Sequence, residues 1–133
     1  MSTDTDLVTS YYAAFNRGDW DGMCSFLAED VAHDLNQSGR EVGRDTFRKF
    51  LDRMNRSYRE QLRDIVIMGT AGRLAAEYVV EGTYLVTDEG LPPANSQRYT
   101  LPGGAFFEIA NGKITRVTNY YNLQDWLKQV SAA

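Results

Sequence analysis

The chain has 133 residues, enough for one domain with a single hydrophobic core, and its hydrophobic (43%) and charged (24%) fractions are ordinary for a globular protein. A net charge of −4 argues against nucleic acid as a partner, because nucleic-acid binding needs a concentrated basic face. The single cysteine, Cys24, excludes an internal disulfide framework and fits a reducing compartment.

The N-terminal segment MSTDTDLVTS carries acidic residues where a signal peptide has basic residues and an apolar run. No segment approaches the roughly 20 apolar residues that a helix needs to span a bilayer. We therefore expect a cytoplasmic protein without a membrane segment. The chain shows no repeat, low-complexity tract or linker, which predicts a single domain over residues 1–133.

The first part of the chain is predicted to contain three helices. The first has one apolar face, formed by Leu7, Tyr11, Ala14 and Phe15. Gly18 suits the left-handed position that ends this helix, and Asp19 is expected to cap a short second helix. The third helix is marked by an apolar stripe opposite charged side chains, formed by Phe47, Phe50, Leu51, Met54 and Tyr58.

Strands are predicted between the second and third helices and after the third. Residues 31–36 alternate as a strand, and from Leu62 onward LRDIVIMGT and RLAAEYVVEGTYLVT have a period of two. Residues 88–97 are expected to form a loop, and RYTLPGGAFFEIA to resume a strand with a bulge or bend at Pro-Gly-Gly. Asn111-Gly112 predicts a hairpin to KITRVTNYYN, and LQDWLKQV a last short helix.

Helices followed by a mostly antiparallel run of strands predict an α+β architecture. We expect a curved sheet whose concave side is covered by the three N-terminal helices. A bent sheet closed in this way is a cone, and its open end is a natural cavity for a small molecule.

Two segments resemble a known family. YYAAFNRGDWDGMCSFLAEDV is similar to the opening of the ketosteroid isomerase and SnoaL-like proteins of the NTF2-like superfamily, and FFEIANGKITRVTNYYN is similar to their terminal hairpin. The resemblance implies the NTF2-like cone, in agreement with the periodicity. It does not determine the chemistry, because this scaffold carries isomerases, cyclases, dehydratases, hydrolases and non-catalytic binders alike.

The resemblance also implies roles for individual residues. In the true isomerases an aspartate moves the proton, while a tyrosine and a protonated aspartic acid hold the enolate oxygen. The family tyrosine falls on Tyr11. The family base falls on Leu35 without a gap and on Asp34 with a one-residue shift, and the second acid falls on Ala105. Half of the donor set is therefore missing, and we expect negligible isomerisation of a 5-ene-3-ketosteroid.

His33 and Asp34 are the candidates for the base. The alternation places His33 inside the cone and Asp34 outside, whereas a shift or bulge turns Asp34 inward. The unperturbed pKa of histidine is close to neutrality, so His33 in a pocket would serve as general acid or base. The alternatives are a buried neutral histidine for His33 and a turn-stabilising or surface role for Asp34. We expect His33 to be the more buried of the two and to line the cavity.

Strand parity indicates the residues that contact a ligand. Because Glu108 must point outward, Phe107 points inward, and the odd positions of the return strand are expected to do likewise. The ligand-binding candidates are Tyr78, Phe107, Asn119 and Tyr121. Tyrosine combines a large apolar body with a polar tip, which suits both core packing and the grip on a rigid carbocyclic ligand.

These observations leave two functional hypotheses and one expectation about assembly. With one histidine and one cysteine there is no credible zinc site, and we expect no metal and no cofactor. The first hypothesis is a cofactor-independent isomerase, cyclase or dehydratase that acts on a small apolar ring-containing carbonyl compound, with Tyr11 as oxyanion donor and Asn119 orienting the ligand. The second is a non-catalytic binding module. An outer sheet face carrying Val79, Thr118 and Tyr120 predicts a homodimer.

Overall fold

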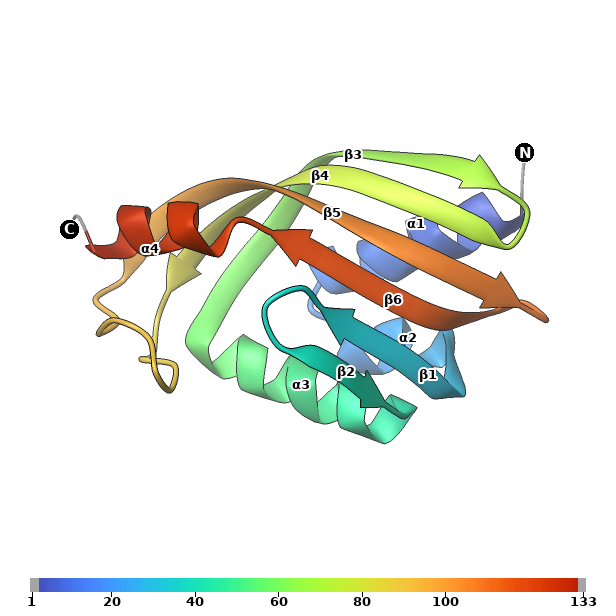
Figure 1. The fold of residues 1–133 in the computed structure, drawn as a ribbon, viewed down its shortest axis with the longest axis horizontal. Helices are drawn as coiled ribbons and strands as arrows, with labels where there is room; N and C mark the ends of the chain where they lie inside the picture. Colours follow the sequence, from blue (N-terminus) through green and yellow to red (C-terminus); the bar gives the residue numbers. More distant parts are fainter. Residues whose placement is uncertain (1–2, 132–133) are drawn as a thin grey trace.

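The computed structural model describes residues 3–131, which form four helices and a six-stranded sheet (Figure 1). Residues 1, 2, 132 and 133 of the predicted domain lie outside the described range. The elements in chain order are α1 (Thr3–Asn16), α2 (Trp20–Ser25), β1 (Leu27–Leu35), β2 (Gly39–Val42), α3 (Arg44–Ser57), β3 (Tyr58–Thr70), β4 (Arg73–Tyr84), β5 (Gln97–Ala110), β6 (Lys113–Tyr121) and α4 (Leu123–Ser131).

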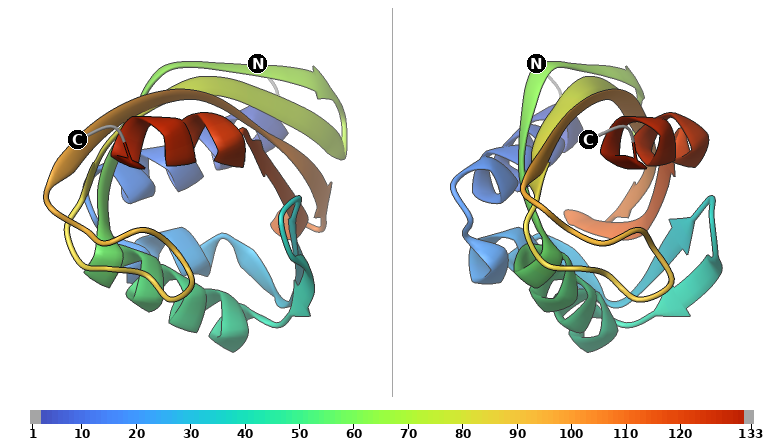
Figure 2. Two further views of the ribbon diagram at one scale, coloured as in Figure 1. Left: turned by 60° about the vertical axis from the view of Figure 1, so that its left-hand side comes forward. Right: turned by 90° about the vertical axis from the view of Figure 1, so that its left-hand side faces the viewer.

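The sheet has the strand order β2-β1-β6-β5-β4-β3. Its neighbouring strands are antiparallel except for the parallel pair β1 and β6. Figure 2 shows the sheet curling around, with α1, α2 and α3 closing its concave side and α4 lying across the end where β5 begins. The predicted α+β cone with a mostly antiparallel sheet is confirmed.

Local chemistry explains several element boundaries. The Asp19 side chain caps α2 by accepting a hydrogen bond from the backbone N–H of Gly22 at 2.8 Å, as predicted. The hairpin between β5 and β6 turns at Asn111 and Gly112, whose φ angles of 54° and 72° are those of a type I′ turn. The sequence signals for these two features were therefore correct.

The strand predictions need correction at four points. β1 begins at Leu27 and β3 at Tyr58, each four residues before the predicted start, and β2 was not predicted at all. All four residues of β2 are exposed, so it has no apolar alternation that would indicate a strand. Of the two alternatives predicted at Pro102-Gly103-Gly104, a bulge or a bend, the bulge is wrong, because β4 pairs with β5 in continuous register there.

The hydrophobic core lies between the concave face of the sheet and the helices. In β4 every second side chain faces the core: Leu74, Ala76, Tyr78 and Val80 are all less than 10% exposed. The residues with an exposed fraction of 0% are Val8, Ala14, Leu27, Val31, Ser57, Tyr84, Phe107, Ile114 and Val117. Within the described residues, no helix has the length and hydropathy of a membrane span.

Candidate functional site

A cavity of about 490 Å³ lies inside the cone, within the usual size range of small-molecule sites. Its walls are mostly apolar and aromatic side chains from α1, α3, the sheet and α4. The aromatic lining residues include Tyr11, Tyr12, Phe15, Phe47, Phe50, Tyr58, Tyr78, Tyr121 and Trp126, and the polar or charged ones besides tyrosine are Gln37, Ser38, Arg53, Glu60, Asp88, Glu89 and Asn119.

Three tyrosines in the wall of this cavity pack against one another, with the ring centre of Tyr12 5.2 Å from that of Tyr11 and 5.6 Å from that of Tyr78. Burial is the main cause that raises the pKa of Tyr11 and Tyr12 well above the usual value, and it raises the pKa of Tyr78 to about 12. All three stay protonated and can donate hydrogen bonds at neutral pH. The buried Tyr12 hydroxyl has no partner of acceptable geometry among the described residues, although Tyr78 is near enough to influence its pKa.

Glu60, from the start of β3, also lines the cavity. Its Oε2 accepts a hydrogen bond of 2.5 Å from the hydroxyl of Tyr99 in β5. Burial raises the pKa of the Glu60 carboxyl, and the hydrogen bond from Tyr99 offsets only part of this rise. Glu60 is therefore a carboxyl group inside an aromatic cavity, with a pKa displaced towards neutrality.

A glycine makes the contact between Glu60 and Tyr99 possible. Gly82 of β4 pairs with Glu60 on one side and with Tyr99 on the other, so the three residues form one row across the sheet. A Cβ atom on Gly82 would lie 2.3 Å from the Tyr99 ring. The ring of Tyr99 therefore crosses the space above Gly82 to reach the carboxyl of Glu60.

Glu60 was not among the predicted site residues, because Tyr58 fits the apolar stripe of the third helix and the next strand was therefore predicted to start at Leu62. The structure starts β3 at Tyr58, and the inward side chains of this strand are Tyr58, Glu60 and Leu62. Extending the period-two pattern upstream by one inward position, which is two residues, would have placed Glu60 on the cavity wall. The strand alternation that would have indicated Glu60 begins at Tyr58, where it overlaps the end of the apolar stripe of the third helix.

His33 points into the cone and is 1% exposed, so the predicted difference in burial from Asp34 is confirmed. Its Nε2 lies 3.1 Å from the side-chain amide nitrogen of Asn119, and its ring packs against Phe47 and Phe50. Burial lowers the pKa of His33 to about 4, against a smaller opposing effect of Asp34, so the imidazole is neutral at pH 7.

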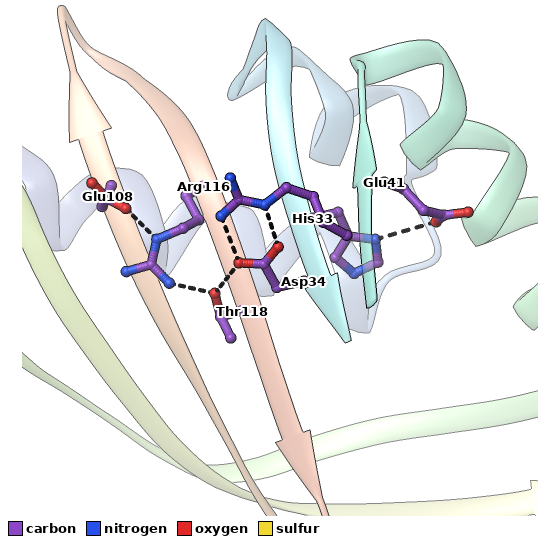
Figure 3. Close-up of polar contacts among 7 residues, drawn as sticks. His33, Asp34, Glu41, Glu108, Arg116 and Thr118 are labelled. Carbon is purple, nitrogen blue, oxygen red and sulfur yellow. Dashed lines mark hydrogen bonds and ion pairs between the residues drawn. The ribbon is translucent and has the colours of Figure 1, made fainter. Parts of the chain in front are cut away.

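The predicted position of His33 in the cavity wall is wrong. The wall is formed by its neighbours Asn119, Phe47 and Phe50, and the imidazole lies behind them. The other ring nitrogen, Nδ1, has no hydrogen-bond partner among the described residues and lies 3.8 Å from the Glu41 carboxylate (Figure 3). This geometry suits His33 to hold the Asn119 amide in place.

Asp34 lies on the outer face of the sheet, as the alternation without a shift predicts (Figure 3). Its carboxylate accepts two hydrogen bonds from Arg40, at 2.6 and 3.0 Å, and one from the Thr118 hydroxyl at 3.0 Å. The hydrogen bond from Arg40 is the main cause that lowers the pKa of Asp34. Arg116 extends the network from Thr118 to Glu108. The alternative register, with Asp34 inside, is wrong.

Comparison with known proteins identifies the family. The profile of the SnoaL-like domain matches residues 8–117. The chain belongs to the SnoaL-like domain family. No curated protein matches this SnoaL-like chain.

Solved structures agree with this assignment. A protein from Xanthomonas campestris pv. campestris, provisionally named a polyketide cyclase, is 66% identical with a TM-score of 0.94, and the match covers 96% of each chain. A second protein with the same provisional name, from Pseudomonas putida, is 57% identical with a TM-score of 0.94, over 98% of each chain. The protein TerC, co-crystallised with polyporic acid, is 18% identical with a TM-score of 0.78, over 98% of this chain and 99% of its own, and shows the shared fold alone.

The remaining predicted site residues of this SnoaL-like protein are divided between wall and core. Tyr11, Tyr78, Asn119 and Tyr121 line the cavity, and Tyr121 is still 38% exposed. Phe107 points inward but is 0% exposed and packs against Tyr11 and Tyr12 in the core, so it is not part of the wall. In the described part of the chain, no group of three or more histidine, cysteine, aspartate or glutamate residues could hold a metal ion.

Proposed function

We propose that this SnoaL-like protein binds a small, mostly apolar, ring-containing carbonyl compound and moves a proton on it without a cofactor, in an isomerisation, cyclisation or dehydration. The observation that carries the proposal is the cavity, in which protonated tyrosine hydroxyls and a buried carboxyl meet within aromatic walls. The provisional name of the two relatives favours cyclisation.

The tyrosine hydroxyls supply the electrostatic part of this chemistry. Removal of a proton next to a carbonyl group places negative charge on the carbonyl oxygen. Tyr11, Tyr12 and Tyr78 have raised pKa values, so each remains a donor while this charge develops. Donors fixed in a dry cavity stabilise such an oxyanion more than water does. Asn119, held by His33, orients the ring.

Hydrogen–deuterium exchange tests the proposal without knowledge of the natural substrate. Cyclic ketones such as 2-tetralone are incubated with the protein in D₂O, and loss of the α-proton signal is followed by NMR. We expect exchange faster than in buffer, inhibited by 2-naphthol, which resembles the enol of 2-tetralone. Binding of 2-naphthol without faster exchange would instead support the non-catalytic binding module.

We also propose that two copies associate through the outer face of the sheet. Phe106 and Tyr120 are each 48% exposed there, and their rings meet edge to face at 5.6 Å. Met68, Ala75 and Phe106 are aligned across β3, β4 and β5. An exposed apolar face of this kind is typical of an interface. Of the residues expected from the sequence, Tyr120 is the exposed one, whereas Thr118 is 7% exposed.

For the location of the protein we propose the cytoplasm. Cys24, the one cysteine of the chain, is buried and free. A free thiol without a disulfide partner is ordinary in a reducing compartment. Detection of a tagged copy by cell fractionation checks this, and recovery of the tagged protein outside the cytoplasmic fraction would contradict it.

A further inference from the structure

The geometry points to Glu60 as the catalytic base of the proposed reaction, with Tyr99 as the positioning residue that holds one of its carboxyl oxygens and leaves the other to the ligand. The inference rests on the proposed function, because it names the group that moves the proton in the same cavity. Neither residue was among the candidates that the sequence indicated.

The pairing of the Glu60 carboxyl differs from that of a structural carboxylate. A buried carboxylate that serves only the structure is normally paired with a cation. In the described residues Glu60 has no ion pair, and its hydrogen-bond partner is the neutral hydroxyl of Tyr99. The cationic residue of the cavity wall, Arg53, stacks over the Phe50 ring, 5.6 Å from its centre. An unpaired carboxyl group that faces a cavity indicates chemistry more than stability.

The two carboxyl oxygens of Glu60 differ in their hydrogen bonding. Tyr99 donates to Oε2, and no hydrogen bond to Oε1 is present among the described residues. Gly82 gives the Tyr99 ring the space for this contact, so the row across the sheet fixes the orientation of the carboxyl group. A base must be held at hydrogen-bond distance from the proton that it takes, and a fixed oxygen beside a free one meets that need.

Tyrosine hydroxyls are the titratable groups that respond to the charge of Glu60. The hydroxyls of Tyr78, Tyr99 and Tyr121 are the ones that sense its charge, and all three have raised pKa values. They are neutral donors at pH 7 and do not compete as bases. Burial displaces the pKa of Glu60 upward, which brings a carboxyl group closer to the value that suits proton transfer near neutral pH.

The proton transfer balances with these groups alone. Oε1 of ionised Glu60 takes the proton from the carbon next to the carbonyl, and the C–H electron pair forms the C=C bond of an enolate. The carbonyl π pair moves to the oxygen, where tyrosine hydroxyls stabilise it. In an isomerisation, protonated Glu60 returns the proton to another carbon of the ligand. In a cyclisation, the enolate carbon attacks a second carbonyl carbon, and the proton goes to the new alkoxide.

The test compares wild type, Glu60→Gln and Tyr99→Phe in the 2-tetralone exchange assay as a function of pH. Glu77→Gln is the matched control, because Glu77 lies exposed on the outer face of the neighbouring strand. We expect Glu60→Gln to slow exchange at least a hundredfold while 2-naphthol still binds, and Glu77→Gln to leave the rate unchanged. Circular dichroism confirms that each variant is folded.

Tyr99→Phe separates positioning from a structural role. Its hydroxyl stabilises the charged form of Glu60, so its loss must raise the pKa of the carboxyl. We expect the acidic limb of the pH–rate profile to move upward, by the same amount as the Glu60 pKa measured by ¹³C NMR in the ligand-free protein. A slower rate with an unmoved limb would overturn the role of Tyr99.

The possible failures of this test are distinct. If wild type accelerates exchange and Glu60→Gln retains that rate within about threefold, Glu60 is not the base although the proposed function stands. If wild type binds 2-naphthol but accelerates exchange of no cyclic ketone, the proposed function fails and the role of Glu60 as base fails with it.

Discussion

At the scale of single residues, two glycines shape the cavity by leaving space for tyrosine rings. Gly82 accommodates the ring of Tyr99, and a Cβ atom on Gly103 would lie 2.5 Å from the ring of Tyr78. Neither glycine has a positive φ angle, so the reason for glycine at both positions is close packing. The sequence predicted a bulge or bend at Gly103, because a glycine in a strand is equally typical of these features and of close packing.

The substitution Gly82→Ala tests this packing. The added Cβ must displace the Tyr99 ring, which we expect to cost about 1–3 kcal/mol in the free energy of unfolding and to break the contact with Glu60. Urea unfolding measures the first effect and ¹³C NMR of Glu60 the second. The control is Gly104→Ala, where the nearest atom to a new Cβ is 3.3 Å away. Equal stability of the two variants would contradict the packing argument.

The hydroxyl of Tyr12 gives a prediction with opposite signs for stability and binding. Because this buried group has no partner of acceptable geometry, Tyr12→Phe should leave the ligand-free protein equally stable or more stable, by up to about 1 kcal/mol. The same change should weaken 2-naphthol binding, since one donor is lost. By contrast, Tyr84→Phe should destabilise the protein, because its hydroxyl donates to the Pro92 carbonyl at 2.6 Å. Calorimetry would contradict the prediction if Tyr12→Phe bound 2-naphthol as tightly as wild type.

The neutral state of His33 makes stability depend on pH. Its pKa is about 4 in the folded protein and 6.5 in the unfolded chain, so protonation favours unfolding. Its contribution is fully present above pH 6.5 and is lost as the pH falls towards 4, by roughly 3 kcal/mol in total. Urea unfolding at pH 7 and pH 4.5 should show a smaller pH effect for His33→Gln than for wild type. An identical pH effect in both proteins would mean that His33 does not titrate in this way.

At the scale of secondary-structure elements, the boundary between α3 and β3 is the hardest to predict from the sequence. Tyr58 continues the apolar stripe of the helix at the correct spacing, yet it is the first residue of the strand. Helical and strand periodicities both fit such a position, and only the pairing of Tyr58 with Tyr84 decides between them. Long periodic elements such as β4 were predictable, because their alternation extends over many residues. Glu60 was not predicted because it lies next to this boundary, where the helical and strand patterns overlap.

β2 and the parallel pair of β1 and β6 could not be predicted for a different reason. β2 is an exposed edge strand held by its pairing with β1, and its own sequence, GREV, carries no pattern. The parallel pairing joins segments that are more than 80 residues apart, for example His33 with Val117. Local periodicity contains no information on such long-range contacts. The inward position of His33 was nevertheless predictable from alternation within β1.

At the scale of the whole molecule, the curved sheet has two faces with different tasks. The concave face carries the cavity, whereas the outer face carries the Asp34 network and an apolar area around Phe106 and Tyr120. We expect the double substitution Phe106→Glu and Tyr120→Glu to convert a dimer into a monomer at micromolar concentration, as measured by sedimentation. Val86→Glu, in an exposed loop, is the control. A wild-type protein that sediments as a monomer would contradict this interface.

The position of a ligand in the cavity, relative to the tyrosine hydroxyls and Glu60, decides whether the cavity can carry out the proposed proton transfer. A crystal structure of the protein with 2-naphthol measures this most directly. We predict that the naphthol oxygen lies within hydrogen-bond distance of a hydroxyl of Tyr11, Tyr12 or Tyr78, and that the free oxygen of Glu60 faces the ring carbon next to it. A naphthol bound outside the cavity, or with its oxygen turned away from the tyrosines and Glu60, would contradict the account.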